Sequence, residues 1–213
     1  MGLVVRDGIY YATGLAAAAI VVGWLAGGWF SAPLWLVAAF CLYFFRDPER
    51  SIPEGPVAVA PADGKVVAVE AESAAVSRIS IFLNIFDVHV NRAPIAGTVC
   101  NVEYRKGLFL VASREDCSTR NEQNIITLQG DGTSVIVKQI AGLIARRIVC
   151  RIRPGDRVSK GERIGLIKFG SRADVLFGPE WEILVQPGAR VAAGSSIIAR
   201  RLDIDGASEA HAH

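Results

Sequence analysis

Two stretches near the C-terminal end repeat one pattern: RPGDRVSKGERIG at residues 153–165 and QPGARVAAGSSII at residues 186–198. Each copy reads Pro-Gly-x-x-Val-x-x-Gly and then continues into an apolar run. Glycine at both corners allows positive φ angles, and the valine between the corners fills a core. The pattern therefore predicts a turn, a short strand and a second turn in each copy, so that one small β unit is used twice.

This turn-strand-turn device resembles the hammerhead units of biotinyl and lipoyl carrier domains. Beyond Pro53, short apolar runs alternate with Gly, Pro, Asp and Asn, which is typical of β-strands joined by turns. The predicted fold is mainly β, a flattened sandwich or barrel of such units. The polar residues 101–122 indicate a long loop. The strands expected before the two repeats are 57–60, 65–70, 77–83, 97–104, 124–129, 134–140 and 148–152.

The N-terminal part is apolar, and no charged residue lies between Asp7 and Arg46. We expect an α-helical membrane hairpin with one arm over 9–25, a turn at Gly27-Gly28 and a second arm over 29–45. Each arm is slightly shorter than the ~20 residues that cross a bilayer comfortably. Two tight spans and a re-entrant hairpin are therefore both compatible with this sequence.

Positive charge flanks the hairpin, with Arg6 before it and Arg46 and Arg50 after it. This pattern favours a cytoplasmic location for both ends. We therefore expect an anchor in the cell (inner) membrane with the remaining domain on the cytoplasmic face. The expected parts are a membrane-anchoring hairpin over 1–46, a β-rich domain over 47–205 and a disordered tail over 206–213.

The bulk composition excludes several classes of protein. The 213 residues carry a formal net charge of +2, so no nucleic acid is expected as a partner. The 4 cysteines are scattered without paired spacing, which favours free thiols in a reducing compartment. Because only one histidine lies outside the tail and no thiols cluster, no metal site is expected.

Three separate segments offer groups for nucleophilic chemistry: Gly170-Ser171 after an apolar run, His89, and Asp63 in an Ala-Asp-Gly turn. A serine hydroxyl needs a base, and histidine, whose ordinary pKa is about 6.5, moves protons near neutral pH. A carboxylate must orient the imidazole. Asp63 is favoured, and Asp87 is the rival because residues two apart on a strand share a face. Gly170 has no Cβ, which lets the hydroxyl approach its carbonyl.

Four segments, taken in order, resemble the phosphatidylserine decarboxylases: FFRDPER at 44–50, PADG at 61–64, FDVHVNRAP at 86–94 and FGSR at 169–172. The resemblance covers almost the whole chain and implies a self-processing enzyme. The Ser171 hydroxyl attacks the carbonyl carbon of the preceding glycine, and an ester forms as the peptide bond breaks. Elimination and hydrolysis then leave a covalent pyruvoyl group derived from Ser171, with no PLP and no metal.

The resemblance also implies the reaction, decarboxylation of phosphatidylserine in the membrane to phosphatidylethanolamine, by a heterodimer of fragments 1–170 and 171–213. His89 is the implied proton donor. Many bacterial members have a second histidine three residues after the first, where this chain has Arg92. Arg92 is either a surface charge or a ligand for a substrate phosphate or carboxylate. Association of the heterodimers into a homo-oligomer is left open.

Two other functions fit parts of the sequence. A membrane-tethered biotinyl/lipoyl-like carrier or adaptor without catalysis would present Lys65, which follows Asp63-Gly64, for modification. Carrier lysines lie in a Met-Lys-Met or Asp-Lys-Ala setting, and neither occurs here. A soluble pyruvoyl-dependent amino-acid decarboxylase shares the cleavage chemistry but leaves the apolar hairpin unexplained.

Overall fold

The computed structural model describes residues 5–110, 116–142, 147–168 and 171–202. The expected tail and Gly170 lie outside the described residues. The chain divides into two compact units, the first made of 1–49 with 85–88 and the second of 50–84 with 89–213.

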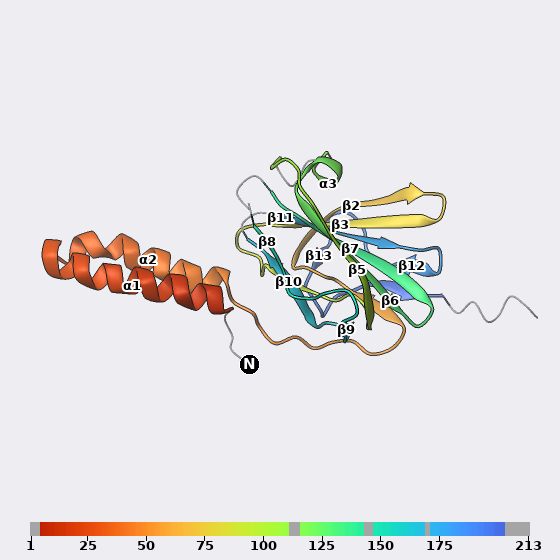
Figure 1. Ribbon diagram of the computed structural model, residues 1–213, viewed down its shortest axis with the longest axis horizontal. Helices are drawn as coiled ribbons and strands as arrows, with labels where there is room; N and C mark the ends of the chain where they lie inside the picture. The colour runs from red at the N-terminus through yellow and green to blue at the C-terminus, as the bar shows by residue number, and fades with distance from the viewer. Residues whose placement is uncertain (1–4, 111–115, 143–146, 169–170, 203–213) are drawn as a thin grey trace, which may run out of the picture. The chain divides into compact units, whose positions relative to one another are not determined.

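The first unit is a helical hairpin of α1 (Arg6–Ala26) and α2 (Gly28–Phe44), which run side by side (Figure 1). Gly27 joins them with a φ of 98°, a conformation that suits glycine. At the open end, the Val5 N–H donates to the Phe45 carbonyl over 2.9 Å. The two helices lie where the sequence predicts the arms of the hairpin.

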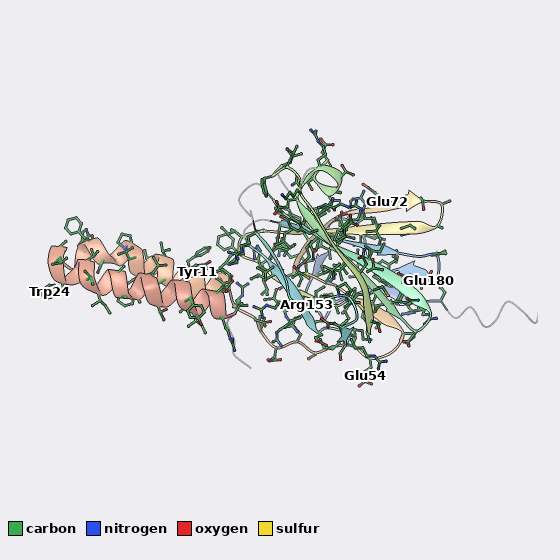
Figure 2. The ribbon with its side chains drawn as sticks, in the orientation of Figure 1. Tyr11, Trp24, Glu54, Glu72, Arg153 and Glu180 are labelled. Carbon is green, nitrogen blue, oxygen red and sulfur yellow. The ribbon has the colours of Figure 1, made fainter. Side chains whose placement is uncertain are left out.

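Large apolar side chains point away from both helices. Trp24 is 85% exposed near the turn of the hairpin, and Trp29 is 89% exposed (Figure 2). Helix α1 is long and apolar enough to cross a membrane, whereas α2, with 17 residues, is a shorter apolar helix. An apolar surface of this extent favours a non-aqueous environment.

The second unit consists of antiparallel strands in three sheets, the largest of them curled (Figure 1). Its order is β13-β2-β3-β11-β7-β6-β5-β9, and the smaller sheets are β1-β14-β12 and β4-β10-β8. The strands are β1 (Val57–Val59), β2 (Gly64–Ser73), β3 (Val76–Leu83), β4 (Val90–Arg92), β5 (Gly97–Arg105), β6 (Gln123–Gly130), β7 (Thr133–Ile140), β8 (Ile148–Cys150), β9 (Arg157–Val158), β10 (Arg163–Ile167), β11 (Ser171–Phe177), β12 (Trp181–Ile183), β13 (Arg190–Val191) and β14 (Ile197–Arg201).

These strands form two copies of one arrangement. VAVAPADGKVVAVE at 57–70 matches VNRAPIAGTVCNVE at 90–103, and each is bonded to one of the two Pro-Gly turns. The Gly194 N–H donates to Ala60 O and the Gly161 N–H to Ala93 O, both over 2.8 Å. The order of the large sheet is accordingly the same read from either end, with β13-β2-β3-β11 matching β9-β5-β6-β7. The mainly β fold is confirmed, and it is built by internal duplication.

One copy is inserted into the other. Strands β4–β10 form the inserted repeat, and β1–β3 with β11–β14 form the host repeat. In the inserted repeat, the two-residue turn Asp131-Gly132 joins β6 to β7. The matching host strands, β3 and β11, pair in the same way but are separated in sequence by the whole inserted repeat. The chain therefore leaves the host repeat through residues 84–89, the outgoing crossover, and re-enters it by the returning crossover, which follows Ile167 of β10 and leads to Ser171 of β11.

The core lies between the sheets and draws on both repeats, with Val66, Ile79, Val137 and Val175 fully buried. The seven strands expected from alternation are all present. The expected loop over 101–122 is wrong in part, because its first residues continue β5 and Cys117–Arg120 form the short helix α3. Polar residues occur in β5 because one face of that strand is exposed to solvent.

Candidate active site

His89 ends the outgoing crossover between the repeats, and Ser171 directly follows the returning one. Ser171 opens β11, and its partner across the sheet is Leu83, the last residue of β3. His89 ends the outgoing crossover, and its carbonyl accepts a hydrogen bond from the N–H of Ile167, the last residue of β10, over 3.3 Å. The two crossovers thus start and finish at the same edge of the fold. Both Ser171 and His89 are fully buried.

The Ser171 side chain points into the core. Along β11, Ala173, Val175 and Phe177 belong to the core, and Ser171 shares their face because side chains alternate along a strand. Its Oγ is buried and makes no hydrogen bond within the part of the chain that the structure describes. A buried hydroxyl in that state costs about 1–3 kcal/mol, and such groups in native proteins call for a functional explanation.

A chain of buried amides lies beside these two residues. The Asn124 Nδ2 donates to Gln139 Oε1 over 3.0 Å, and the Gln139 Nε2 donates to Asn91 Oδ1 over 2.9 Å. Gln139 is the β7 partner of Ala173, and Asn91 is two residues beyond His89. A Cβ on Gly165 would lie 2.6 Å from Gln139 Nε2, so glycine there makes room for the amide. These hydrogen-bonded amides place fixed, buried polar groups on the β7 and β4 side of the site.

Asp63 lies in a turn that packs against β4. The Pro61 carbonyl accepts the Arg92 N–H over 2.9 Å, which places the turn alongside the strand that follows His89. The Asp63 carboxylate itself binds Arg50 Nη2, with distances of 3.0 Å to Oδ1 and 2.8 Å to Oδ2. It also accepts the Ala193 N–H over 2.8 Å. Within the described residues, the carboxylate is therefore held firmly, and its hydrogen bonds go to Arg50 and Ala193.

Two further candidates have different settings. Asp87 and His89 would share a face only if their segment were a strand, but β4 begins at Val90, so that argument does not apply. Asp87 belongs to segment 85–88, which groups with the helical unit. Arg92 is 5% exposed, and its Nη1 donates to the Gly161 carbonyl over 3.0 Å, so it is a buried side chain rather than a surface charge.

Sequence reasoning missed the groups around these candidates. Asn91 carried a usable signal, since it lies two residues after His89 on a strand. Gln139 carried another, because it is a polar residue inside the apolar run VIVKQI at 135–140. Arg50 carried none, because no local motif links it to Asp63, 13 residues further along, and only the fold joins them.

The fold and the site define a class: a mainly β protein with an apolar helical hairpin, and with a serine and a histidine buried where one repeat is inserted into another. The family model for phosphatidylserine decarboxylase matches residues 37–199. The phosphatidylserine decarboxylase proenzyme of Solibacter usitatus is 74% identical over 200 residues, covering 94% of this chain and 98% of that protein.

Proenzymes of the same name from Cupriavidus taiwanensis and Magnetococcus marinus are 41% and 43% identical. The alignments cover 95% and 93% of this chain, and 97% and 95% of those proteins. This chain belongs to the phosphatidylserine decarboxylase family.

Proposed function

We propose that this chain decarboxylates phosphatidylserine to phosphatidylethanolamine with a covalent pyruvoyl group made from its own Ser171. The observation that carries the proposal is the Ser171 Oγ, which is buried in the core without a hydrogen bond from any described residue. A hydroxyl in that setting fits a group that will be consumed. Self-cleavage would transfer the Oγ to the carboxylate of the preceding glycine and release the Ser171 nitrogen as ammonia. The Cα would then carry the ketone oxygen, and the pairing of β11 from Arg172 onward would stay intact. The relatives' designation as proenzymes supports self-cleavage.

The chain's own residues have distinct roles in this proposal. The pyruvoyl group supplies the electron sink for loss of CO2. His89 takes the proton of the Ser171 hydroxyl during self-cleavage and returns a proton to the substrate carbon after decarboxylation. Asp63 or Asp87 orients His89, and the favoured Asp63 would do so while its carboxylate stays bound to Arg50 and Ala193. The Asn91–Gln139 amides keep the site ordered. Arg92 supports the site from within the fold by holding the turn at Gly161.

Cleavage between Gly170 and Ser171 would leave fragments 1–170 and 171–213 as a heterodimer. The second fragment carries β11–β14, so both fragments contribute to the core. The exposed apolar surface of α1 and α2 supports membrane anchoring, and the flanking arginines support a cytoplasmic catalytic domain. Protease that digests the β-rich unit in sealed right-side-out membranes would contradict that orientation.

The carrier hypothesis has no structural support. Lys65 lies near the start of β2 and pairs with Phe82 of β3 and Arg190 of β13, whereas a carrier lysine needs the exposed tip of a hairpin. The likeness to carrier domains belongs to the fold alone: we propose that each repeat is a hammerhead unit of the biotinyl and lipoyl type. Superposition on a solved carrier domain tests this, and strands that connect in a different order would contradict it.

Mass spectrometry of the denatured, detergent-purified full chain tests the function. We expect two fragments divided at Gly170 and Ser171, the smaller with a carbonyl that reacts with hydroxylamine, together with release of CO2 from phosphatidylserine. Ser171→Ala should remain one chain without activity. Ser134→Ala, an exposed serine on the neighbouring strand β7, serves as the control and should cleave normally. An active preparation containing only the intact chain would refute the proposal.

A further inference from the structure

Arg172 directly follows Ser171 and is only 2% exposed. Its Nε donates to Asp174 Oδ1 over 2.6 Å, and its Nη2 donates to Ser80 Oγ over 2.6 Å. Its Nη1 donates to Cys117 Sγ of α3 over 3.8 Å. One guanidinium therefore binds Asp174 on its own strand β11, Ser80 on β3 and Cys117 in α3.

A second arginine, Arg78, completes this buried cluster. Its Nη1 donates to Ser80 Oγ over 3.1 Å and lies 3.7 Å from Asp174 Oδ2. Burial acts to lower the pKa of Arg78, but Asp174 and two carboxylates of β2 outweigh it and raise the pKa above its ordinary value. Those two carboxylates, which bind its other nitrogens, are Glu70 and Glu72. The Arg78 guanidinium therefore stays charged and paired within the cluster.

The cluster lies on the face of β11 opposite to the Ser171 side chain. Arg172 and Asp174 alternate with Ala173 and Val175, which point into the core together with Ser171. The guanidinium therefore cannot touch the reacting atoms. Any effect it has on the reaction must pass through the backbone of β11.

The backbone at this point has little other support. On the β3 side, pairing of β11 begins at Ser171, but on the β7 side it begins at Arg172 with Ile140. Once the chain is cut before Ser171, that residue becomes a chain end held by one neighbouring strand. Chain ends fray unless they are tied down. Arg172 is the first residue of the new end that is held on both sides.

We propose that Arg172 is a positioning residue for the decarboxylation: its buried guanidinium, fixed by Asp174, Ser80 and Cys117, keeps the newly cut end of β11 in register. The reacting group formed from Ser171 then stays in the core, on the face of β11 that carries Ala173 and Val175. The proposal rests on the proposed function. Arginine suits the task because its planar fork binds two acceptors at fixed angles, which lysine cannot do.

Arg78 provides a matched control. It is buried in the same cluster and shares Ser80 and Asp174, but it lies on β3, which self-cleavage leaves uncut. A merely structural role predicts equal effects for the two arginines. A positioning role predicts that only Arg172 affects turnover.

The experiment compares Arg172→Met, Arg172→Lys and Arg78→Met in the full-length, detergent-purified chain. Activity is expressed per carbonyl titrated with hydroxylamine, and thermal unfolding is followed in parallel. We expect Arg172→Met to lower kcat at least tenfold with KM changed less than twofold, and Arg172→Lys to recover part of the loss. Arg78→Met should lose comparable stability and keep kcat within threefold. Equal kcat values per carbonyl for Arg172→Met and Arg78→Met would overturn the proposal.

A second comparison decides the case in which Arg172→Met does not fold. Arg172→Lys and Arg78→Lys are then compared by hydrogen exchange of the peptide 171–177 in the cleaved enzyme. Faster exchange at its first residues in Arg172→Lys alone supports positioning, and equal exchange overturns it. Wild type and Ser171→Ala run in parallel, because an uncut wild-type chain would refute self-cleavage itself and not the role of Arg172.

Discussion

The Asp63 carboxylate has two roles to distinguish, its ion pair with Arg50 and the proposed orientation of His89. Asp63→Asn and Arg50→Met both abolish the 2.8 Å ion pair, but only the first removes the negative charge. If Asp63 orients His89, we expect Asp63→Asn to slow self-cleavage at least tenfold, because positioned acid–base groups contribute about 10²–10⁴-fold. Arg50→Met should cleave within threefold of wild type. The measurement is the appearance of the two fragments with time on denaturing gels.

Two further variants complete that test. His89→Ala keeps the main-chain bond to Ile167 and should block or greatly slow cleavage, while its circular dichroism stays unchanged. If Asp63→Asn and Arg50→Met cleave equally fast, Asp63 is not the orienting group. Asp87→Asn, tested under the same conditions, would then be expected to show the tenfold loss.

At this scale the sequence predicts the reactive candidates but not their supports. Ser171, His89 and Asp63 can be named from residue type and local motif, because nucleophile, base and carboxylate are chemically distinct. Arg172 cannot be placed in the same way, since an arginine beside an aspartate two residues on is usually a surface pair. Its burial depends on α3 covering the outer face of β3 and β11, and no local pattern encodes that packing.

Among the elements, the Pro-Gly unit of the inserted repeat, residues 153–165, has two corner glycines with different constraints. Gly155 and Gly161 have φ angles of 93° and 78°, but only Gly161 is crowded: a Cβ there would lie 2.3 Å from Ile52 Cδ1. We expect Gly155→Ala to cost about 1 kcal/mol of unfolding free energy from backbone strain alone. Gly161→Ala should cost at least twice as much, because Ile52 must also move. Urea unfolding measures both, and equal losses would show that Ile52 adapts freely.

The elements themselves follow largely from local pattern. Alternating apolar residues predict the strands, the Pro-Gly turns predict the two-residue strands β9 and β13, and the uncharged N-terminal stretch predicts both helices. The start of β4 at Val90 was not predictable, because FDVHV at 86–90 alternates like a strand before the pairing begins. Pairing with β10, which is distant along the sequence, sets that boundary.

At the scale of the whole molecule, the proposed cleavage site lies at the boundary between the inserted repeat and the host repeat. The inserted repeat closes its β6–β7 hairpin with the turn Asp131-Gly132, and the host repeat opens the equivalent β3–β11 hairpin to admit the insertion. A cut before Ser171 therefore falls where a hairpin turn would lie. Strand β11 keeps both neighbours, and no core strand is divided. The duplication was only half visible in the sequence, because the second pair of matching segments, 57–70 and 90–103, shares little beyond Ala-Pro-x-x-Gly-x-Val and a final Val-Glu.

It follows that the two fragments should behave as one folded unit. Fragment 171–213 supplies β11 to the middle of the eight-stranded sheet, where Ala173, Val175 and Phe177 are fully buried. We expect the cleaved protein in detergent to elute as a single species in 1 M NaCl, because core burial and strand pairing are not screened by salt. Its unfolding temperature should rise with protein concentration, since unfolding releases two chains. Uncleaved Ser171→Ala should show no such dependence, and separate elution of the fragments would show that β11 is not held by its neighbours.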